Sequence, residues 1–212
     1  GYKKGLSKES ALNSAAYAGQ LLLDHLGEDT GIRMILHKKI PLNSGLSSNA
    51  ASAVAGVFAV NELLGRPLER YDLIDFAERA ARTFNIRLFP AQVASILFGG
   101  IILYRPEIPG NFQKIYCPEG IQLSLVVPSM EYNESEKLHF LESSSETDQR
   151  ILESGNAASF ISSFYTSDFN LFGSSLQEKF IDPGLLKAYP YVGPLAELAI
   201  SRGGFGCGLA GL

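Results

Sequence analysis

The feature that most constrains this chain is a turn that runs directly into a small-residue helix, Ile40 to Ser52, "IPLNSGLSSNAAS". Gly45 lets the backbone pass close to a ligand, and serine or asparagine before an alanine-rich run is typical of a helix start. The first helical turn leaves backbone N–H groups without partners, and the aligned peptide dipoles add positive potential there, so an anion is stabilised without a lysine. The pattern predicts either an anion-binding loop or an ordinary capped helix. It is not a Walker A loop, because no Lys-Ser or Lys-Thr pair follows the glycine.

The composition limits the classes of partner and the number of domains. The chain has 212 residues, 46% of them hydrophobic, which suits one large domain or two small ones. Its 18 lysines and arginines are scattered and its net charge is -4, so we expect no nucleic-acid partner. The longest apolar runs are too short to span a bilayer, and no segment resembles a signal peptide.

Other features point to a cytoplasmic fragment. Cys117 and Cys207 lie far apart in the sequence without metal-ligand spacing, which favours free thiols in a reducing cytoplasm. The chain begins without Met and stops abruptly on "GLAGL", so we expect it to be a piece of a longer protein.

Hydrophobic periodicity predicts an α+β fold in two layers, with a domain boundary in 107–112. Gly27 is the expected C-cap of the first helix, and Leu73, Phe76, Ala77 and Ala80 are the expected inward face of the third. Helices are expected over 10–26, 49–64, 68–84, 151–166, 170–180 and 194–202, and strands over 32–40, 96–104 and 121–127.

The longer run "IPLNSGLSSNAASAVAGVFAVNELLG" resembles the phosphate-binding motif of the GHMP kinases, Pro-x-x-x-Gly-Leu-Gly-Ser-Ser-Ala, and within that superfamily it is closest to homoserine kinase. "VASILFGGIIL", "VVPSMEYNESEKLHFL", "SLQEKFIDPGLLKAYPYV" and "SRGGFGCGLAGL" resemble later segments of that family, in the same order. The resemblance implies the GHMP kinase architecture. Residues 1–106 would form the N-terminal domain, like the second domain of ribosomal protein S5 but without its first part. Residues 107–212 would form a ferredoxin-like C-terminal domain without its end.

The resemblance also implies an activity: transfer of a phosphoryl group from ATP, with Mg²⁺, to the hydroxyl of L-homoserine in threonine biosynthesis. Small-residue helix faces and apolar strands leave room for a homodimer. By position, Ser48 is a candidate metal ligand as well as a phosphate-binding residue. The candidate nucleotide-binding residues are Pro41, Ser44, Gly45, Leu46, Ser47, Ser48, Asn49, Ala50 and Ala51.

The sequence departs from the family inside the loop itself. Ser47 stands where the motif has a glycine, and Asn49 stands where it has a serine. Asn49 can still donate or accept a hydrogen bond, whereas a residue other than glycine at position 47 restricts how the loop turns.

It also departs at the positions implied for metal and substrate. A glutamate implicated with Mg²⁺ falls at Arg82, and a His-x-Asp-Asn-Val-Ala-Pro motif that meets homoserine falls at 89–95, with Ala91 and Gln92 in place of polar family residues. Gln92 is therefore the candidate substrate residue. Glu78, one turn before Arg82, is the candidate catalytic carboxylate if the register slips by four, or half of an ordinary i,i+4 ion pair. Leu185 stands where an arginine would hold the substrate carboxylate.

Three hypotheses follow. The chain belongs to a homoserine kinase, to a catalytically silent GHMP-fold binding or interaction protein, or to a GHMP kinase with a different acceptor. Removing the metal and substrate carboxylates favours the silent protein, whereas the extended resemblance favours the first.

Overall fold

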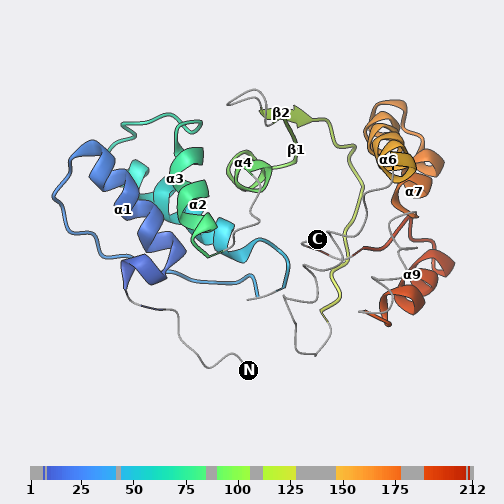
Figure 1. Cartoon of the computed structure of the whole chain (residues 1–212), viewed down its shortest axis with the longest axis horizontal. Helices are drawn as coiled ribbons and strands as arrows, with labels where there is room; N and C mark the ends of the chain where they lie inside the picture. Colours follow the sequence, from blue (N-terminus) through green and yellow to red (C-terminus); the bar gives the residue numbers. More distant parts are fainter. Residues whose placement is uncertain are drawn as a thin grey trace. The chain divides into compact units, whose positions relative to one another are not determined.

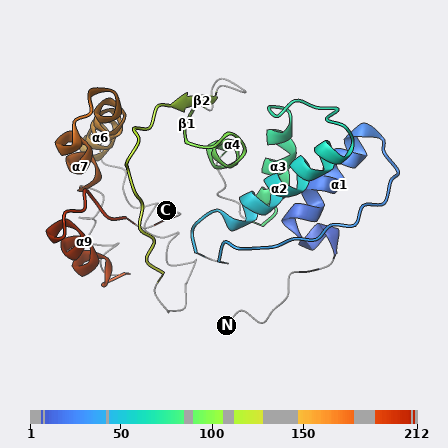
Figure 2. The ribbon, with the colours of Figure 1, turned by 180° about the vertical axis from the view of Figure 1, so that it is seen from behind.

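The computed structural model describes residues 7, 9–41, 44–84, 90–105, 112–127, 147–177, 189–208 and 210 (Figures 1 and 2). The chain divides into two compact units, 1–115 and 116–212.

The first helix of unit 1 is α1, Ser14–Leu26, and it follows a short 3-10 turn, η1, Ser10–Leu12. Its N-cap is Asn13, whose side-chain oxygen accepts hydrogen bonds from the backbone N–H groups of Ala15 and Ala16 at 3.1 and 3.3 Å. The helix ends at Gly27 in the left-handed conformation (φ 68°), which confirms the expected C-cap. The expected start at Ser10 was wrong, because Asn13 has an extended backbone and begins a new helix with its own cap.

Three further helices complete the core of unit 1: α2, Ser48–Leu63; α3, Leu73–Arg82; and α4, Pro90–Phe98. Helices α1, α2 and α3 pack against one another, and α4 packs against α2 and α3 (Figure 1). The expected inward face of α3 is confirmed, since its four residues are at most 6% exposed. The largest fully buried side chains are Leu22, Leu73, Val57 and Val93.

The contact between α1 and α2 depends on a glycine. A Cβ atom added to Gly56 would lie 2.6 Å from the carbonyl carbon of Ala15 and 2.8 Å from its Cα, with the carbonyl oxygen closer still. The two backbones therefore touch at this point, which only a residue without a side chain allows.

A two-stranded antiparallel sheet follows α4. Strands β1, Ile101–Tyr104, and β2, Phe112–Ile115, pair in the register Ile101 with Ile115 and Tyr104 with Phe112. The hydroxyl of Tyr71, just before α3, donates to the Phe112 carbonyl at 3.2 Å and so ties the sheet to the helices. The strand expected from residue 96 begins later, because 96–98 complete α4 and Gly99 and Gly100 turn the chain with φ of 72° and 79°.

Two other expected strands are absent from the described residues. Along 31–40, odd-numbered residues are exposed and even-numbered ones are half-buried, as the alternation predicts, but the segment has no hydrogen-bonded neighbour strand in the part that the structure describes. Residues 122–127 are exposed throughout. Both predictions were wrong for one reason: a strand requires a partner ladder, and local alternation does not supply one.

Unit 2 contains α6, Thr147–Thr166; α7, Phe169–Gln177; and α9, Val192–Ser201. Phe160 and Phe164 of α6 contact Phe172 of α7, each with ring centroids 5.6 Å apart, and Phe205 contacts the same ring. Among the described helices of both units, none combines the length and apolar character needed to cross a membrane.

Candidate functional site

The loop before α2 is closed by Ser44. Its hydroxyl donates to the carbonyl of Pro41 at 2.8 Å and accepts from the N–H of Leu46 at 3.4 Å. Gly45 follows with φ 74° and Ser47 with φ 53°, both in the left-handed region. The loop therefore makes two left-handed steps just before the helix begins.

Ser47 stands where the family motif has a glycine, and a residue with a side chain restricts how the loop can turn. A residue with a Cβ atom pays roughly 1–2 kcal/mol in the left-handed conformation, whereas glycine does not. Ser47 nevertheless adopts it, and its side chain makes no capping hydrogen bond to the helix. The backbone thus keeps the turn that glycine would take at lower cost.

The start of α2 presents unused donors. The first helical hydrogen bond runs from the N–H of Ala51 to the carbonyl of Ser47 at 2.9 Å, so the N–H groups of Ser48, Asn49 and Ala50 precede the helical ladder. The small side chains of Ala50 and Ala51 keep this flank of the helix narrow. These amides form the kind of cradle that binds phosphate at a helix N-terminus.

Ser48 adds a second, independent observation. The residue is only 9% exposed, and its Oγ is the one buried side-chain polar atom without a hydrogen-bond partner in the described part of the chain. Its carbonyl is already used, since it accepts from the Ser52 hydroxyl at 2.9 Å. A buried hydroxyl without a partner costs about 1–3 kcal/mol, which a ligand oxygen at this place would offset.

A small pocket of about 100 Å³ lies beside this helix start. It is bounded by the start of α1, the extended segment 31–39, the start of α2 and the end of the chain segment after α3. Its walls are part apolar and part polar. The lining residues are Leu12, Asn13, Ser14, Leu36, Lys38, Asn49, Ser52 and Phe84.

Lys38 contributes the only charged side chain among these lining residues. Its Nζ donates to Oδ1 of Asn49 at 3.2 Å. Burial disfavours the charged form and lowers the pKa of Lys38 below its usual value.

This pKa shift predicts how stability changes with pH. Between the lowered pKa of folded Lys38 and about 10.5, the unfolded chain binds more protons at this lysine than the folded chain, so the free energy of unfolding gains a contribution that rises with pH. Below that window the folded state carries the full cost of the buried charge. Because Lys38→Met removes the titration, we expect the difference in melting temperature between wild type and variant to change across this alkaline window. Equal pH dependence in thermal melts from pH 7 to 10.5 would contradict the expectation.

The other candidate residues lie outside the pocket lining. Glu78 pairs with Arg82 at 2.7 Å, so the structure contains the i,i+4 ion pair. Gln92 lies on α4, where its carbonyl accepts from the Ser95 hydroxyl at 3.0 Å, and Ala91 precedes it. No group of three His, Cys, Asp or Glu side chains that could hold a metal occurs among the described residues. Leu185 and the stretch 85–89 lie outside them.

Lys38 and the pocket residues from α1 were not among the residues predicted from the sequence. One signal was present: Lys38 shares its even-numbered register with Ile32, Met34 and Leu36, the inward positions of the alternating segment. A lysine on the inward face of such a segment indicates a site or a buried pair. Asn13 and Ser14 carry no comparable signal, because they join the site only through the packing of α1 on α2.

Comparison with known proteins places this geometry in a family. Residues 10–100 match the model of the GHMP kinases N terminal domain. The homoserine kinase of Chlorobium phaeovibrioides is 32% identical over 94% of this chain, and that of Chlorobaculum tepidum is 30% identical over 86%. The chain spans 64% and 56% of the lengths of these two relatives, less than two thirds of each.

A solved structure agrees with the sequence comparisons. The crystal structure of homoserine kinase from Cytophaga hutchinsonii matches all of this chain with a TM-score of 0.86 and 30% identity, and the chain covers 67% of it. The fold of the solved structure, the motif at the start of α2 and the curated relatives agree on one classification. The chain belongs to the homoserine kinase family of the GHMP kinases.

Proposed function

We propose that the protein carrying this chain is an ATP-dependent phosphotransferase that phosphorylates the side-chain hydroxyl of L-homoserine in the cytoplasm, and that α2 and its loop bind the phosphates of ATP. The observation that carries the proposal is the buried hydroxyl of Ser48, which has no hydrogen-bond partner in the part of the chain that the structure describes, at a helix start whose first three N–H groups precede the helical ladder. The acceptor is proposed from the relatives, which are named homoserine kinases.

The described residues fit the phosphates of ATP. Backbone N–H groups and the Ser48 hydroxyl all donate, and the N-terminal dipole of α2 favours negative charge. The two left-handed steps at Gly45 and Ser47 turn the loop so that these donors lie at the helix start. The chain's own residues would thereby hold the phosphates in place, which is the main contribution a protein makes to phosphoryl transfer.

The described residues offer fewer ligands for Mg²⁺ than donors for phosphate. Mg²⁺ prefers oxygen ligands and is usually bound through one or two carboxylates together with substrate phosphates. At the loop, the described residues offer the Ser48 hydroxyl, whereas Glu78 is paired with Arg82. Ser48 would therefore hold the metal beside the ATP phosphates, where Mg²⁺ supplies charge neutralisation.

We also propose that the pocket beside the loop receives part of the bound ATP at its phosphate end. Asn49 belongs to both the pocket and the helix start, and Leu12, Leu36 and Phe84 supply the apolar part of the pocket wall. The domain assignment made from the sequence remains part of the proposal: a ribosomal protein S5-like domain over 1–106 and a ferredoxin-like domain over 107–212. A homodimer remains part of it too.

The test is an ATP titration by calorimetry with Mg²⁺, on wild type and Ser48→Ala. Loss of a hydrogen bond to a charged phosphate is worth about 1.5–3 kcal/mol, so we expect the variant to bind ATP roughly tenfold more weakly or worse. Its melting temperature should not fall, because the deleted hydroxyl has no hydrogen-bond partner among the described residues. Ser10→Ala, an exposed serine of the same unit, is the matched control and should bind ATP like wild type.

Wild type that shows no ATP binding at millimolar concentration would overturn the nucleotide proposal and support the silent GHMP-fold protein. Coupled ADP release with homoserine, mevalonate and shikimate, measured side by side, identifies the acceptor. Faster turnover with either alternative than with homoserine would overturn the proposed substrate.

A further inference from the structure

We infer that Lys38 is a positioning residue that locks the side-chain amide of Asn49, so that the NH₂ group of Asn49 and not its oxygen faces the bound nucleotide. The inference rests on the proposed function and deepens it. It is based on one hydrogen bond, in which Lys38 Nζ donates to Asn49 Oδ1 at 3.2 Å. The bond joins an extended segment to the second residue of α2.

Lys38 and Asn49 differ in the hydrogen bonds that their side chains can make. A lysine ammonium has three donors and no acceptor, whereas an asparagine amide has one oxygen that accepts and one NH₂ that donates. The amide can rotate by 180° and exchange these two ends. Next to Lys38 only the amide oxygen can accept a hydrogen bond. An NH₂ group in that place would face the ammonium as a second donor, and no hydrogen bond would form. Lys38 therefore selects one of the two orientations.

The selected orientation leaves the NH₂ group of Asn49 available. No acceptor for it occurs among the described residues, and Asn49 lines the pocket beside the three free N–H groups. Ser14 lines the same pocket and is 6% exposed, and its hydroxyl can donate a hydrogen bond. The pocket thus presents donors from two sides.

A surface of donors fits a ligand rich in acceptors. Phosphoryl oxygens carry the highest density of acceptors and the negative charge in a nucleotide, and they would be repelled by an amide oxygen turned toward them. The Lys38 lock avoids that repulsion. Burying an ammonium next to a neutral acceptor, with no carboxylate in the pocket lining, does not favour folding. A role in orienting Asn49 gives the half-buried Lys38 a function that folding alone does not.

The test measures binding of ATP and of inorganic tripolyphosphate to the full chain by calorimetry. Lys38→Met should weaken both ligands about tenfold, because the amide is then free to turn its oxygen toward the phosphates. Lys38→Arg, which also has donors only, should restore affinity to within about threefold. Lys39→Met is the matched control, because Lys39 is the exposed neighbour of the same type, and it should bind like wild type.

Two further variants separate positioning from direct charge. Asn49→Asp puts an oxygen at both ends of the side chain and should weaken ATP binding at least as much as Lys38→Met. In an Asn49→Ala background, Lys38→Met should change ATP affinity by less than about twofold, because no amide remains to be locked. Thermal melts confirm that each variant is folded.

The outcomes distinguish the two proposals. If wild type binds neither ligand, the proposed function fails. If wild type binds ATP but Lys38→Met binds it equally well, or still loses tenfold in the Asn49→Ala background, then the nucleotide site stands and the lock is overturned. An effect on ATP without one on tripolyphosphate would also overturn the lock, because Lys38 would then act on the nucleoside.

Discussion

Gly56→Ala is expected to destabilise unit 1 by about 3 kcal/mol or more, at the upper end of the costs of overpacking a core. The added methyl would overlap the backbone of Ala15, and the distances of 2.6 and 2.8 Å to its carbonyl carbon and Cα lie below any relaxed contact. Backbone cannot rotate away as a side chain can, so α1 and α2 must separate. Chemical denaturation followed by circular dichroism would measure the loss.

Two other helical glycines calibrate this result. Gly19→Ala meets the side chain of Val60 at 2.9 Å, which can adjust, so we expect a loss below that of Gly56→Ala. Gly155→Ala in α6 meets nothing within 4 Å and should stabilise its helix by about 0.5–1 kcal/mol. If Gly56→Ala were no worse than Gly19→Ala, the close contact between the α1 and α2 backbones would be wrong.

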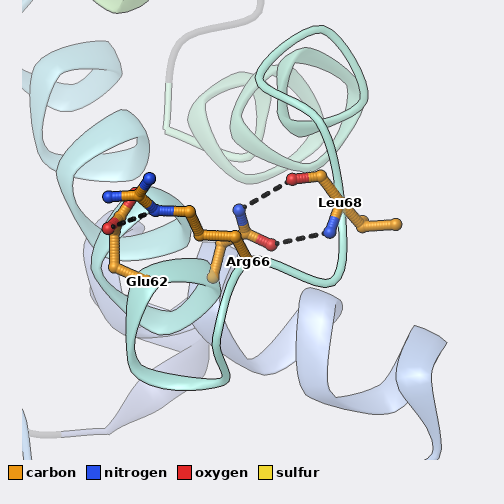
Figure 3. Close-up of polar contacts among 4 residues, drawn as sticks. Glu62, Arg66 and Leu68 are labelled. Carbon is orange, nitrogen blue, oxygen red and sulfur yellow. Dashed lines mark hydrogen bonds and ion pairs between the residues drawn. The ribbon is translucent and has the colours of Figure 1, made fainter.

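Asn61→Ala is expected to cost about 2–4 kcal/mol, because it leaves two backbone groups of Leu68 without partners. Asn61 is 3% exposed. Its side chain donates to the Leu68 carbonyl at 2.9 Å and accepts from the Leu68 N–H at 3.1 Å, which fixes the connection from α2 to α3. Figure 3 draws both bonds as dashed lines that end at Leu68. Denaturant unfolding of the variant measures the loss.

The neighbouring ion pair provides the control. Arg66 pairs with Glu62 at 2.8 Å in the same turn (Figure 3), but the arginine side chain is 72% exposed. Glu62→Gln should therefore cost about 0.5 kcal/mol or less. Equal losses for Asn61→Ala and Glu62→Gln would show that the buried amide does not hold the connection.

Local patterns predicted the helices better than the strands. In α3 the 3.6-residue spacing of Leu73, Phe76, Ala77 and Ala80 predicted the buried face, because a helix satisfies its backbone within one segment. The strand expected at 32–40 has the right alternation of exposure and no described partner, because pairing depends on residues elsewhere in the chain. Residues 96–98 were assigned to a strand although they end α4, because short apolar runs do not distinguish the two.

In the candidate site too, the local part could be predicted from the sequence and the part that depends on distant residues could not. The loop could be predicted because Gly45, Ser47 and the helix start are adjacent in sequence, and its conformation is a local property. The Lys38–Asn49 bond joins residues 11 positions apart and forms only when the extended segment lies along α2. The roles of Glu78 and Gln92 were carried over from a family motif, and neither residue lines the pocket.

The glycine contact between α1 and α2 has a consequence for motion. Because Ala15 touches α2 at Gly56, α2 cannot slide along α1 without the two backbones moving apart. If the loop adjusts around the proposed nucleotide, the adjustment must therefore come from backbone rotation upstream of Ser48. Within this unit the helix pair is the fixed part, and the turn that contains Gly45 and Ser47 is where such a rotation would take place.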